Sequence, residues 1–103
     1  MHIVKINQGR ADLCDSKFGS FIRTLASRGV IDADINDDGI VLITFDDGSV
    51  RIMREDKSFI RTIRSMSNSQ AVSARWSGDD IALRLANGRT ELRRVGGGFI
   101  RRF

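Results

Sequence analysis

One short phrase recurs along this chain at nearly constant spacing, and it constrains the fold more than any other feature. The phrase, Ser-Phe-Ile-Arg-Thr or its variant Gly-Phe-Ile-Arg-Arg, lies at residues 20–24, 58–62 and 98–102. Its phenylalanines are 38 and 40 residues apart. A second landmark has the same period, with spacings of 39 and 40 between Gly9, Gly48 and Gly88. Two independent landmarks that share a period indicate three copies of one structural unit.

Each copy contains a hairpin signal just before the phrase. The glycine follows Gln8 in the first copy, Asp47 in the second and Asn87 in the third. Asp-Gly and Asn-Gly favour type I′ turns, in which both central residues need positive φ, and Gln-Gly is a weaker version of the same signal. Apolar and polar residues alternate on both sides of these turns, which is typical of strands.

The alternation assigns an apolar face to each hairpin. Its expected members are Val4, Ile6, Ala11 and Leu13 in the first hairpin, Ile43, Phe45, Val50 and Ile52 in the second, and Leu83, Leu85, Thr90 and Leu92 in the third. The opposite face of the second hairpin is also apolar, with Ile40, Leu42, Thr44 and Met53. The opposite face of the third is polar, with Asp80, Ala82, Arg84, Arg89, Glu91 and Arg93. We therefore expect the middle unit to be covered on both sides and the last unit to form an end.

The pattern predicts an all-β fold of about eleven short antiparallel strands in three meander repeats of about 40 residues. We expect a single domain over residues 1–103, with repeats at approximately 1–25, 30–64 and 71–103. The first of these repeats lacks its first strand. The expected strands are 2–7, 10–14, 20–25, 30–35, 39–45, 49–54, 58–64, 71–76, 80–86, 90–94 and 98–102.

An α+β fold is the alternative. Apolar residues such as Phe18, Phe21 and Leu25 also fit one face of a helix, and Ser20 or Ser58 is a suitable N-cap. In that interpretation short helices occupy residues 17–28 and 57–68. The final copy of the phrase ends one residue before the last residue and leaves no room for a helix, which favours strands in all three copies.

The residue types argue against an enzyme. There is one cysteine, Cys14, and one histidine, His2, beside the initiator methionine. A structural zinc site needs about four Cys or His ligands, and Cys/His nucleophilic catalysis needs a histidine held firmly beside the cysteine; one cysteine and one terminal histidine meet neither requirement. The Asp-rich stretches at 35–39, 45–49 and 77–81 are interpreted as turns, where Asp bonds to its own backbone. We expect no catalytic residues, no cofactor and no metal, and we interpret Cys14 as a strand residue.

Charge is distributed unevenly. The net charge is +4, but residues 1–57 carry a balance of −2 and residues 58–103 a balance of +6. Arginine supplies 14 of the 17 basic side chains, and arginine favours contacts with phosphate and carboxylate groups. The predicted partner-binding surface consists of Arg75, Arg84, Arg89, Arg93, Arg94, Arg101 and Arg102. An acidic protein or a nucleic acid is the expected partner of such a surface.

The second half of the chain resembles a blade of the WD-repeat β-propellers. An outer strand of the type Ile-Arg-Thr is followed by an inner strand that runs from Val72 to Trp76-Ser77, and then by an Asn-Gly hairpin. The family's Trp-Asp pair is replaced by Met53-Arg54 and Arg93-Arg94, and its Gly-His pair is absent. The resemblance therefore implies the blade geometry without the family's side-chain network.

The resemblance bears on function because propellers close with four to eight blades. Two full units and one partial unit cannot close alone, so we expect self-association, with Ile40 and Leu42 in an interface between units or chains. The predicted function is a non-enzymatic protein-binding or assembly module. The alternative is a small nucleic-acid-associated or inhibitory accessory protein that uses the Arg-rich residues 58–103. A cytoplasmic location is expected, because no apolar run approaches the length of a membrane span and the N-terminus does not resemble a signal peptide.

Overall fold

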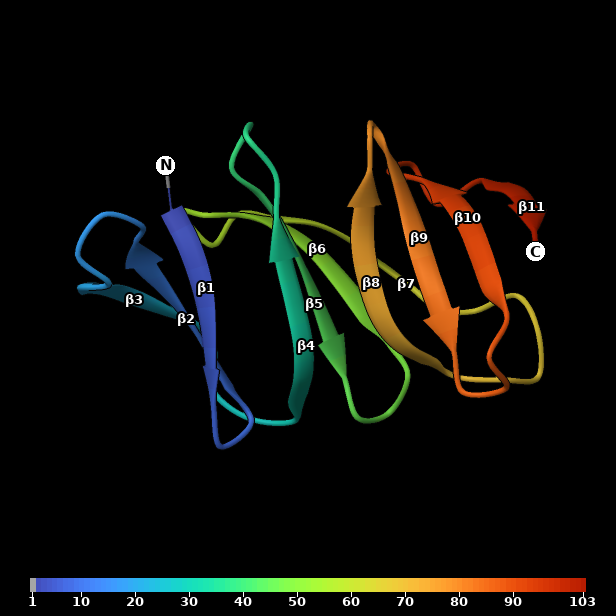
Figure 1. Cartoon of the computed structure of the whole chain (residues 1–103), viewed down its shortest axis with the longest axis horizontal. Helices are drawn as coiled ribbons and strands as arrows, with labels where there is room; N and C mark the ends of the chain where they lie inside the picture. The colour runs from blue at the N-terminus through green and yellow to red at the C-terminus, as the bar shows by residue number, and fades with distance from the viewer. Residues whose placement is uncertain (1) are drawn as a thin grey trace.

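Three antiparallel sheets make up the computed structural model, which describes residues 2–103 (Figure 1). The first sheet contains β1 (His2–Asn7), β2 (Arg10–Asp15) and β3 (Phe21–Ala26). The second contains β4 (Val30–Ile35), β5 (Ile40–Phe45), β6 (Val50–Arg54) and β7 (Phe59–Ile63). The third contains β8 (Ala71–Ser77), β9 (Asp80–Leu85), β10 (Thr90–Arg94) and β11 (Phe99–Arg102). Within each sheet, every strand pairs with its neighbours in the sequence, so each repeat is a meander.

The repeated phrase forms strands in all three copies. It lies in β3, β7 and β11, which are the last strands of the three sheets. The predicted all-β fold is confirmed, and the alternative with helices at 17–28 and 57–68 is wrong. The described part of the chain contains no helix, and hence none of the length and apolarity that a membrane crossing requires.

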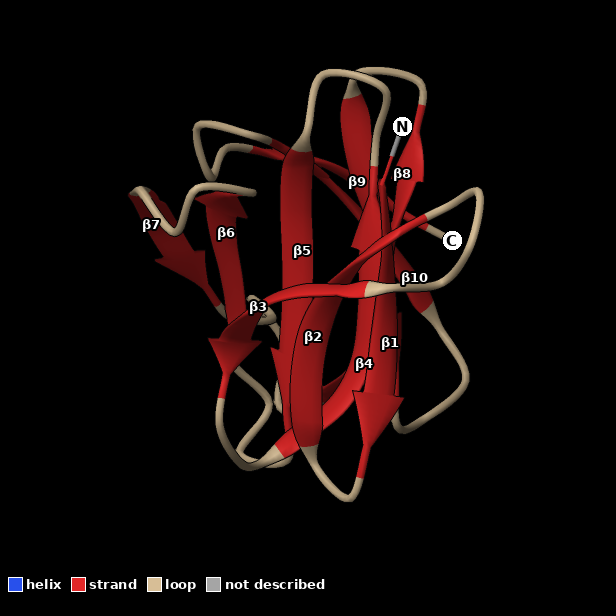
Figure 2. Cartoon of the chain, turned by 90° about the vertical axis from the view of Figure 1, so that its left-hand side faces the viewer, coloured by secondary structure: helices blue, strands red, loops and turns tan. Residues whose placement is uncertain are grey.

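The sheets stack face to face along the longest dimension of the molecule, which measures 37 × 26 × 21 Å (Figure 1). The first strands of the sheets lie next to one another: β4 contacts β1 on one side and β8 on the other. Figure 2 looks onto the first sheet, with β4 and β5 behind it. This arrangement is that of consecutive propeller blades.

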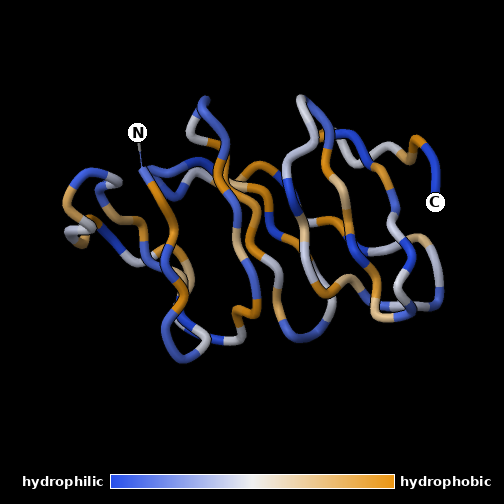
Figure 3. Tube along the Cα trace, in the orientation of Figure 1, coloured by the Kyte–Doolittle hydropathy of each residue, from blue (hydrophilic) through white to orange (hydrophobic). Residues whose placement is uncertain are grey.

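Two hydrophobic cores flank the middle sheet. One joins it to the first sheet through Leu13 and Leu25 against Val41, Ile43 and Met53. The other joins it to the third sheet; its members include Leu42, Val50, Ile52, Ile81, Leu83 and Leu85. In Figure 3 apolar stretches follow the strands, whereas the turns are hydrophilic. The middle sheet is thus buried on both faces, as its sequence predicted.

Turn geometry decides which residues share a face. Gln8 and Gly9 have φ of 52° and 78°, and Asn7 pairs with Arg10, so the first hairpin has the predicted two-residue type I′ turn. The predicted face of Val4, Ile6, Ala11 and Leu13 is correct, since Val4 pairs with Leu13 and Ile6 with Ala11. The Gln-Gly signal, the weakest of the three, marks the hairpin whose register was predicted correctly.

The second and third hairpins have three-residue loops instead. Phe45 bonds to Ser49 and Leu85 to Arg89, and the last loop residue, Gly48 or Gly88, has positive φ. One extra residue shifts the register by one, which moves a side chain to the other face of its sheet.

The predicted faces of these two hairpins are therefore wrong. Leu42 faces Ile52 in the second hairpin. In the third, Glu91 lies opposite Leu83 and Arg93 opposite Ile81. The polar pair is consequently on the face that packs against the middle sheet.

Candidate functional site

The third sheet carries a buried ion pair where the sequence predicted a solvated face. Glu91 is 0% exposed and Arg93 is 5% exposed. Arg93 Nη1 donates to Glu91 Oε1 at 3.2 Å and to the carbonyl oxygen of Arg64 at 2.6 Å. Its Nε donates to the carbonyl oxygen of Gly97 at 3.0 Å, and its Nη2 donates to the same oxygen. Glu91 accepts the backbone N–H of Met66 at 3.0 Å. Arg93 is therefore engaged inside the chain and does not belong to the free surface.

Three predicted arginines share the outer face of the third sheet, which is the face turned away from the middle sheet. Thr90, Leu92 and Arg94 alternate along β10 and therefore point to the same side of the sheet. Their cross-strand partners Arg84, Arg101 and Asp80 point to that side too, because paired residues share a face. All three arginines are exposed. Arg101 lies over the Phe103 ring, 4.7 Å from its centre. We name this surface, Arg84, Thr90, Leu92, Arg94 and Arg101, the outer Arg face.

Two further predicted arginines lie away from this face. Arg89 is exposed at the base of the β9–β10 loop, opposite Leu85. Arg102 is on the side of Glu91, with 3.9 Å between its Nη2 and Glu91 Oε2. The seven predicted arginines thus do not form one surface.

Arg75 is exposed but already has a partner within the chain. Its Nη2 donates to Asp32 Oδ1 at 2.7 Å, which joins β8 to β4. Burial raises the pKa of the Asp32 carboxyl above its usual range, and the Arg75 charge opposes this rise. Asp32 Oδ2 is buried without a hydrogen-bond partner in the described chain. Arg75 is best understood as a link between two sheets.

The two residues predicted for self-association lie between units of the same chain. Leu42 is 0% exposed in the core that joins the second and third sheets. Ile40 is partly buried against that core, and its carbonyl oxygen accepts the Trp76 indole N–H at 3.2 Å. Leu42 is therefore not available to a second chain.

In the Asp-rich turn at 45–49 an aspartate bonds to its own backbone, as the sequence predicted, and Asp56, outside the three predicted stretches, does the same. Asp47 Oδ1 accepts the backbone N–H of Ser49 at 2.9 Å, and Asp56 Oδ1 accepts that of Ser58 at 2.8 Å. Hydrogen bonds from these serines lower the pKa of both carboxyls. Across residues 2–103, no three His, Cys, Asp or Glu side chains are grouped so that they could hold a metal ion.

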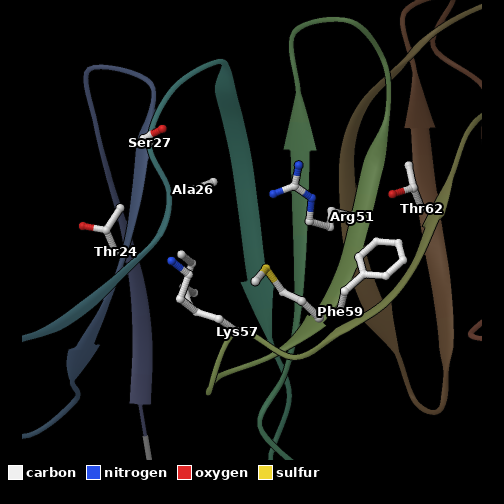
Figure 4. A pocket seen from close by; sticks show the side chains of 9 residues that line it. Thr24, Ala26, Ser27, Arg51, Lys57, Phe59 and Thr62 are labelled. Carbon is white, nitrogen blue, oxygen red and sulfur yellow. The ribbon is translucent and has the colours of Figure 1, made fainter.

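An open groove of about 510 Å³ separates the first and second sheets on the side of their last strands (Figure 4). This volume is within the range of ligand sites in proteins. Its lining residues are Thr24, Leu25, Ala26, Ser27, Arg51, Met53, Lys57, Phe59 and Thr62. We name it the β3–β7 groove. It brings together residues from the ends of the first two repeats.

The β3–β7 groove is cationic and partly apolar. Arg51 and Lys57 both line it, and its lining includes no carboxylate. The guanidinium of Arg51 lies over the Phe45 ring, 4.7 Å from its centre. Phe59 also lines the groove and is 63% exposed. Figure 4 shows the nitrogen atoms of Arg51 and Lys57 in the space between Thr24 and Thr62.

Sequence reasoning missed this groove because it counted charges in the second half of the chain. A signal was nevertheless present in the lengths of the connections between repeats. Three residues join β3 to β4, whereas seven join β7 to β8. A repeat that is shorter at one junction has less chain to cover the space between its sheets.

Comparisons with known proteins bear on the fold. No family model matches the sequence, and no curated protein matches it. Solved structures do match over nearly the whole chain. BamB from Moraxella catarrhalis is similar with a TM-score of 0.67 and 13% identity, over 99% of this chain and 32% of that one.

Two further structures give the same result. The Cps50 (Swd1) β-propeller domain of Myceliophteria thermophila has a TM-score of 0.65 and 14% identity, over 99% of this chain and 38% of that one. PorZ, a surface component of the type-IX secretion system of Porphyromonas gingivalis, has a TM-score of 0.65 and 18% identity, over 96% of this chain and 15% of that one. The three sheets therefore resemble β-propeller blades, and the chain spans 15 to 38% of the length of these proteins.

Proposed function

We propose that this chain is a non-enzymatic protein-binding or assembly module that associates with further copies of itself. The observation that carries the proposal is the unequal burial of the three sheets. The middle sheet has both faces covered, whereas the first and third sheets each have one face against a neighbour. In this proposal residues 1–103 act as one domain.

The geometry of propellers supports self-association. Blades close into a ring of four to eight, in which every sheet lies between two others. Two copies of this chain would supply six sheets. A two-fold arrangement would place the third sheet of each copy against the first sheet of the other, which covers all the end faces.

The outer Arg face is the surface of the third sheet that such a contact would use. Leu92 is half-buried at its centre, and Phe103 is exposed beside Thr90. Leu42 has no part in this contact because it is already buried within the chain.

The molar mass in solution tests the proposal. Light scattering at tens of micromolar should give twice the 11.5 kDa of one chain. Leu92→Glu should return the mass to that of one chain, because it adds a charge where the end faces meet. Ala86→Glu is the matched control, since Ala86 is exposed in the β9–β10 loop and should leave the mass unchanged. A mass of 11.5 kDa for the unaltered chain at these concentrations would contradict self-association.

A second candidate function rests on the arginines of the outer Arg face. Arg84 and Arg94 are exposed, and no carboxylate of the described chain is within ion-pair distance of either. A nucleic-acid-associated role predicts binding to random-sequence DNA and RNA at low salt. Each phosphate contact adds roughly one unit to the slope of log affinity against log salt. Replacing Arg84 and Arg94 by alanine should flatten this slope, and absence of binding at low salt would remove the candidate.

A further inference from the structure

The β3–β7 groove has a counterpart between the second and third sheets, and that counterpart is filled. The seven residues of the β7–β8 connection, 64–70, run over the face that Glu91 and Arg93 occupy. The β3–β4 connection has only three residues, 27–29, and leaves the corresponding face open. The covered junction between the second and third sheets therefore shows that a segment of polypeptide can occupy such a groove.

The two junctions present the same positions to the space between the sheets. Arg51 pairs with Ile43 and Thr62, and Glu91 pairs with Leu83 and Arg102, each 40 residues later. The other equivalent positions are Met53 and Arg93, Lys57 and Gly97, and Phe59 and Phe99. Lys57 and Gly97 also share a positive φ, of 77° and 94°. The grooves are thus equivalent in backbone and differ in side chains and in cover.

The filled groove holds a bent, non-repetitive stretch of polypeptide by polar contacts. Glu91 accepts the N–H of Met66 at 3.0 Å and a hydrogen bond from Ser65 Oγ at 3.3 Å. Arg93 donates to the carbonyl oxygen of Arg64 at 2.6 Å. Side chains of β10 thereby provide hydrogen-bond partners for backbone groups of residues 64–70, a segment that forms no strand.

The polarity is reversed in the open groove. Arg51, a donor, stands where Glu91 accepts, and Lys57 adds a second positive charge where the filled groove has Gly97. Met53 replaces Arg93 and gives an apolar floor beside the exposed ring of Phe59. A guanidinium and an ammonium in one groove favour carboxylates, and the ring and the thioether favour an apolar side chain.

We propose that the β3–β7 groove binds an acidic segment of a partner protein, with carboxylates at Arg51 and Lys57 and an apolar side chain against Met53 and Phe59. Ser27 and Thr62 also line the groove and offer hydroxyls to the backbone of that segment, whereas the Thr24 hydroxyl already donates to Asp12 Oδ1 at 2.9 Å. The inference rests on the proposed protein-binding function and adds the class of ligand and the place where it binds.

The test is fluorescence anisotropy with a labelled Asp-Glu-Phe-Asp-Glu peptide as the probe. Asn-Gln-Phe-Asn-Gln, of the same shape without charge, is the peptide control. Arg51→Gln and Lys57→Gln should each weaken binding by about tenfold, because each removes a charge-assisted hydrogen bond. Arg89→Gln and Lys17→Gln make the same changes of charge at exposed residues outside the groove and should leave the affinity within about twofold.

The absence of binding at low salt would overturn the inference. So would equal losses in the groove and control variants, or equal affinity for the charged and uncharged peptides. An oligothymidine that binds as tightly as the acidic peptide would also overturn it, since the ligand would then be a general polyanion.

The molar mass measured on the same samples separates this inference from self-association. Chains that associate but do not bind the peptide refute the groove proposal alone. Chains that bind the peptide as monomers refute self-association and leave the groove proposal intact.

Discussion

Glu91 provides the sharpest test of the packing between the second and third sheets. Glu91→Ala removes the carboxylate that pairs with Arg93 and that accepts the Met66 N–H. Arg93 lies in a region closed to water, since it is 5% exposed, whereas the Met66 N–H is only partly buried. The variant therefore leaves a buried cation and a partly buried backbone donor without the carboxylate that both contact.

The expected loss of stability follows from that burial. Removing one partner of a buried ion pair costs about 3–5 kcal/mol, because the other charge stays buried. The whole domain is expected to have a free energy of unfolding of about 5–15 kcal/mol, so this loss is a large part of it. Glu91→Gln should lose less, since its amide oxygen still accepts the Met66 N–H.

Urea unfolding followed by the fluorescence of Trp76 measures the effect. Trp76 is the only tryptophan, and its indole N–H bonds to the carbonyl oxygen of Ile40 across the same two sheets. Arg84→Ala, exposed on the neighbouring strand, is the control and should stay within about 0.5 kcal/mol of the unaltered chain. A loss below about 1 kcal/mol for Glu91→Ala would refute the buried pair, because surface pairs contribute that little.

Three further predictions concern stability. Leu42→Ala should lower the free energy of unfolding by about 2–5 kcal/mol in urea, because it leaves a cavity between two sheets; a change no larger than that of a surface residue would contradict the core. Asp32→Asn should stabilise the chain at pH 7 and lose this advantage as the pH falls through the raised folded pKa toward 3.8, because the natural carboxyl contributes stability that is fully present below 3.8 and is lost as pH rises through the folded pKa. Asp47→Asn should have the opposite pH dependence, since a lowered folded pKa gives stability above 3.8 that is lost as pH falls through the folded pKa. Thermal unfolding between pH 2 and 7 measures both, and parallel curves for variant and natural chain would contradict these assignments.

The repeat, the strands and the sandwiched middle sheet could be predicted because they depend on local signals. Gly48 and Gly88, which have positive φ, indicate hairpins. The alternation of apolar and polar residues indicates the strands on either side of them. The register could not be predicted from the same signal. Glycine has positive φ both in a two-residue type I′ turn and at the end of a three-residue loop, so the dipeptide does not distinguish them.

That single ambiguity accounts for the error at the predicted site. With a two-residue turn, Arg93 would lie beside Arg84 on an exposed face. With the three-residue loop Arg93 is turned toward the middle sheet, where it donates hydrogen bonds to Glu91 and to the carbonyl oxygen of Arg64. The β3–β7 groove was missed for a different reason: it arises from how two consecutive repeats stack, and the only sequence signal for it, the short β3–β4 connection, was passed over in favour of the charges in the second half of the chain.

Small-angle X-ray scattering of the unaltered chain tests the central claim, that three blades are completed by association, most directly. One measurement gives both the mass and the radius of gyration. One chain has a radius of gyration of 13.0 Å, whereas a compact body of two chains should have about 17 Å. The account predicts a mass of twice 11.5 kDa and the larger radius at tens of micromolar. A mass of 11.5 kDa and a radius near 13.0 Å, both constant as concentration rises, would contradict it.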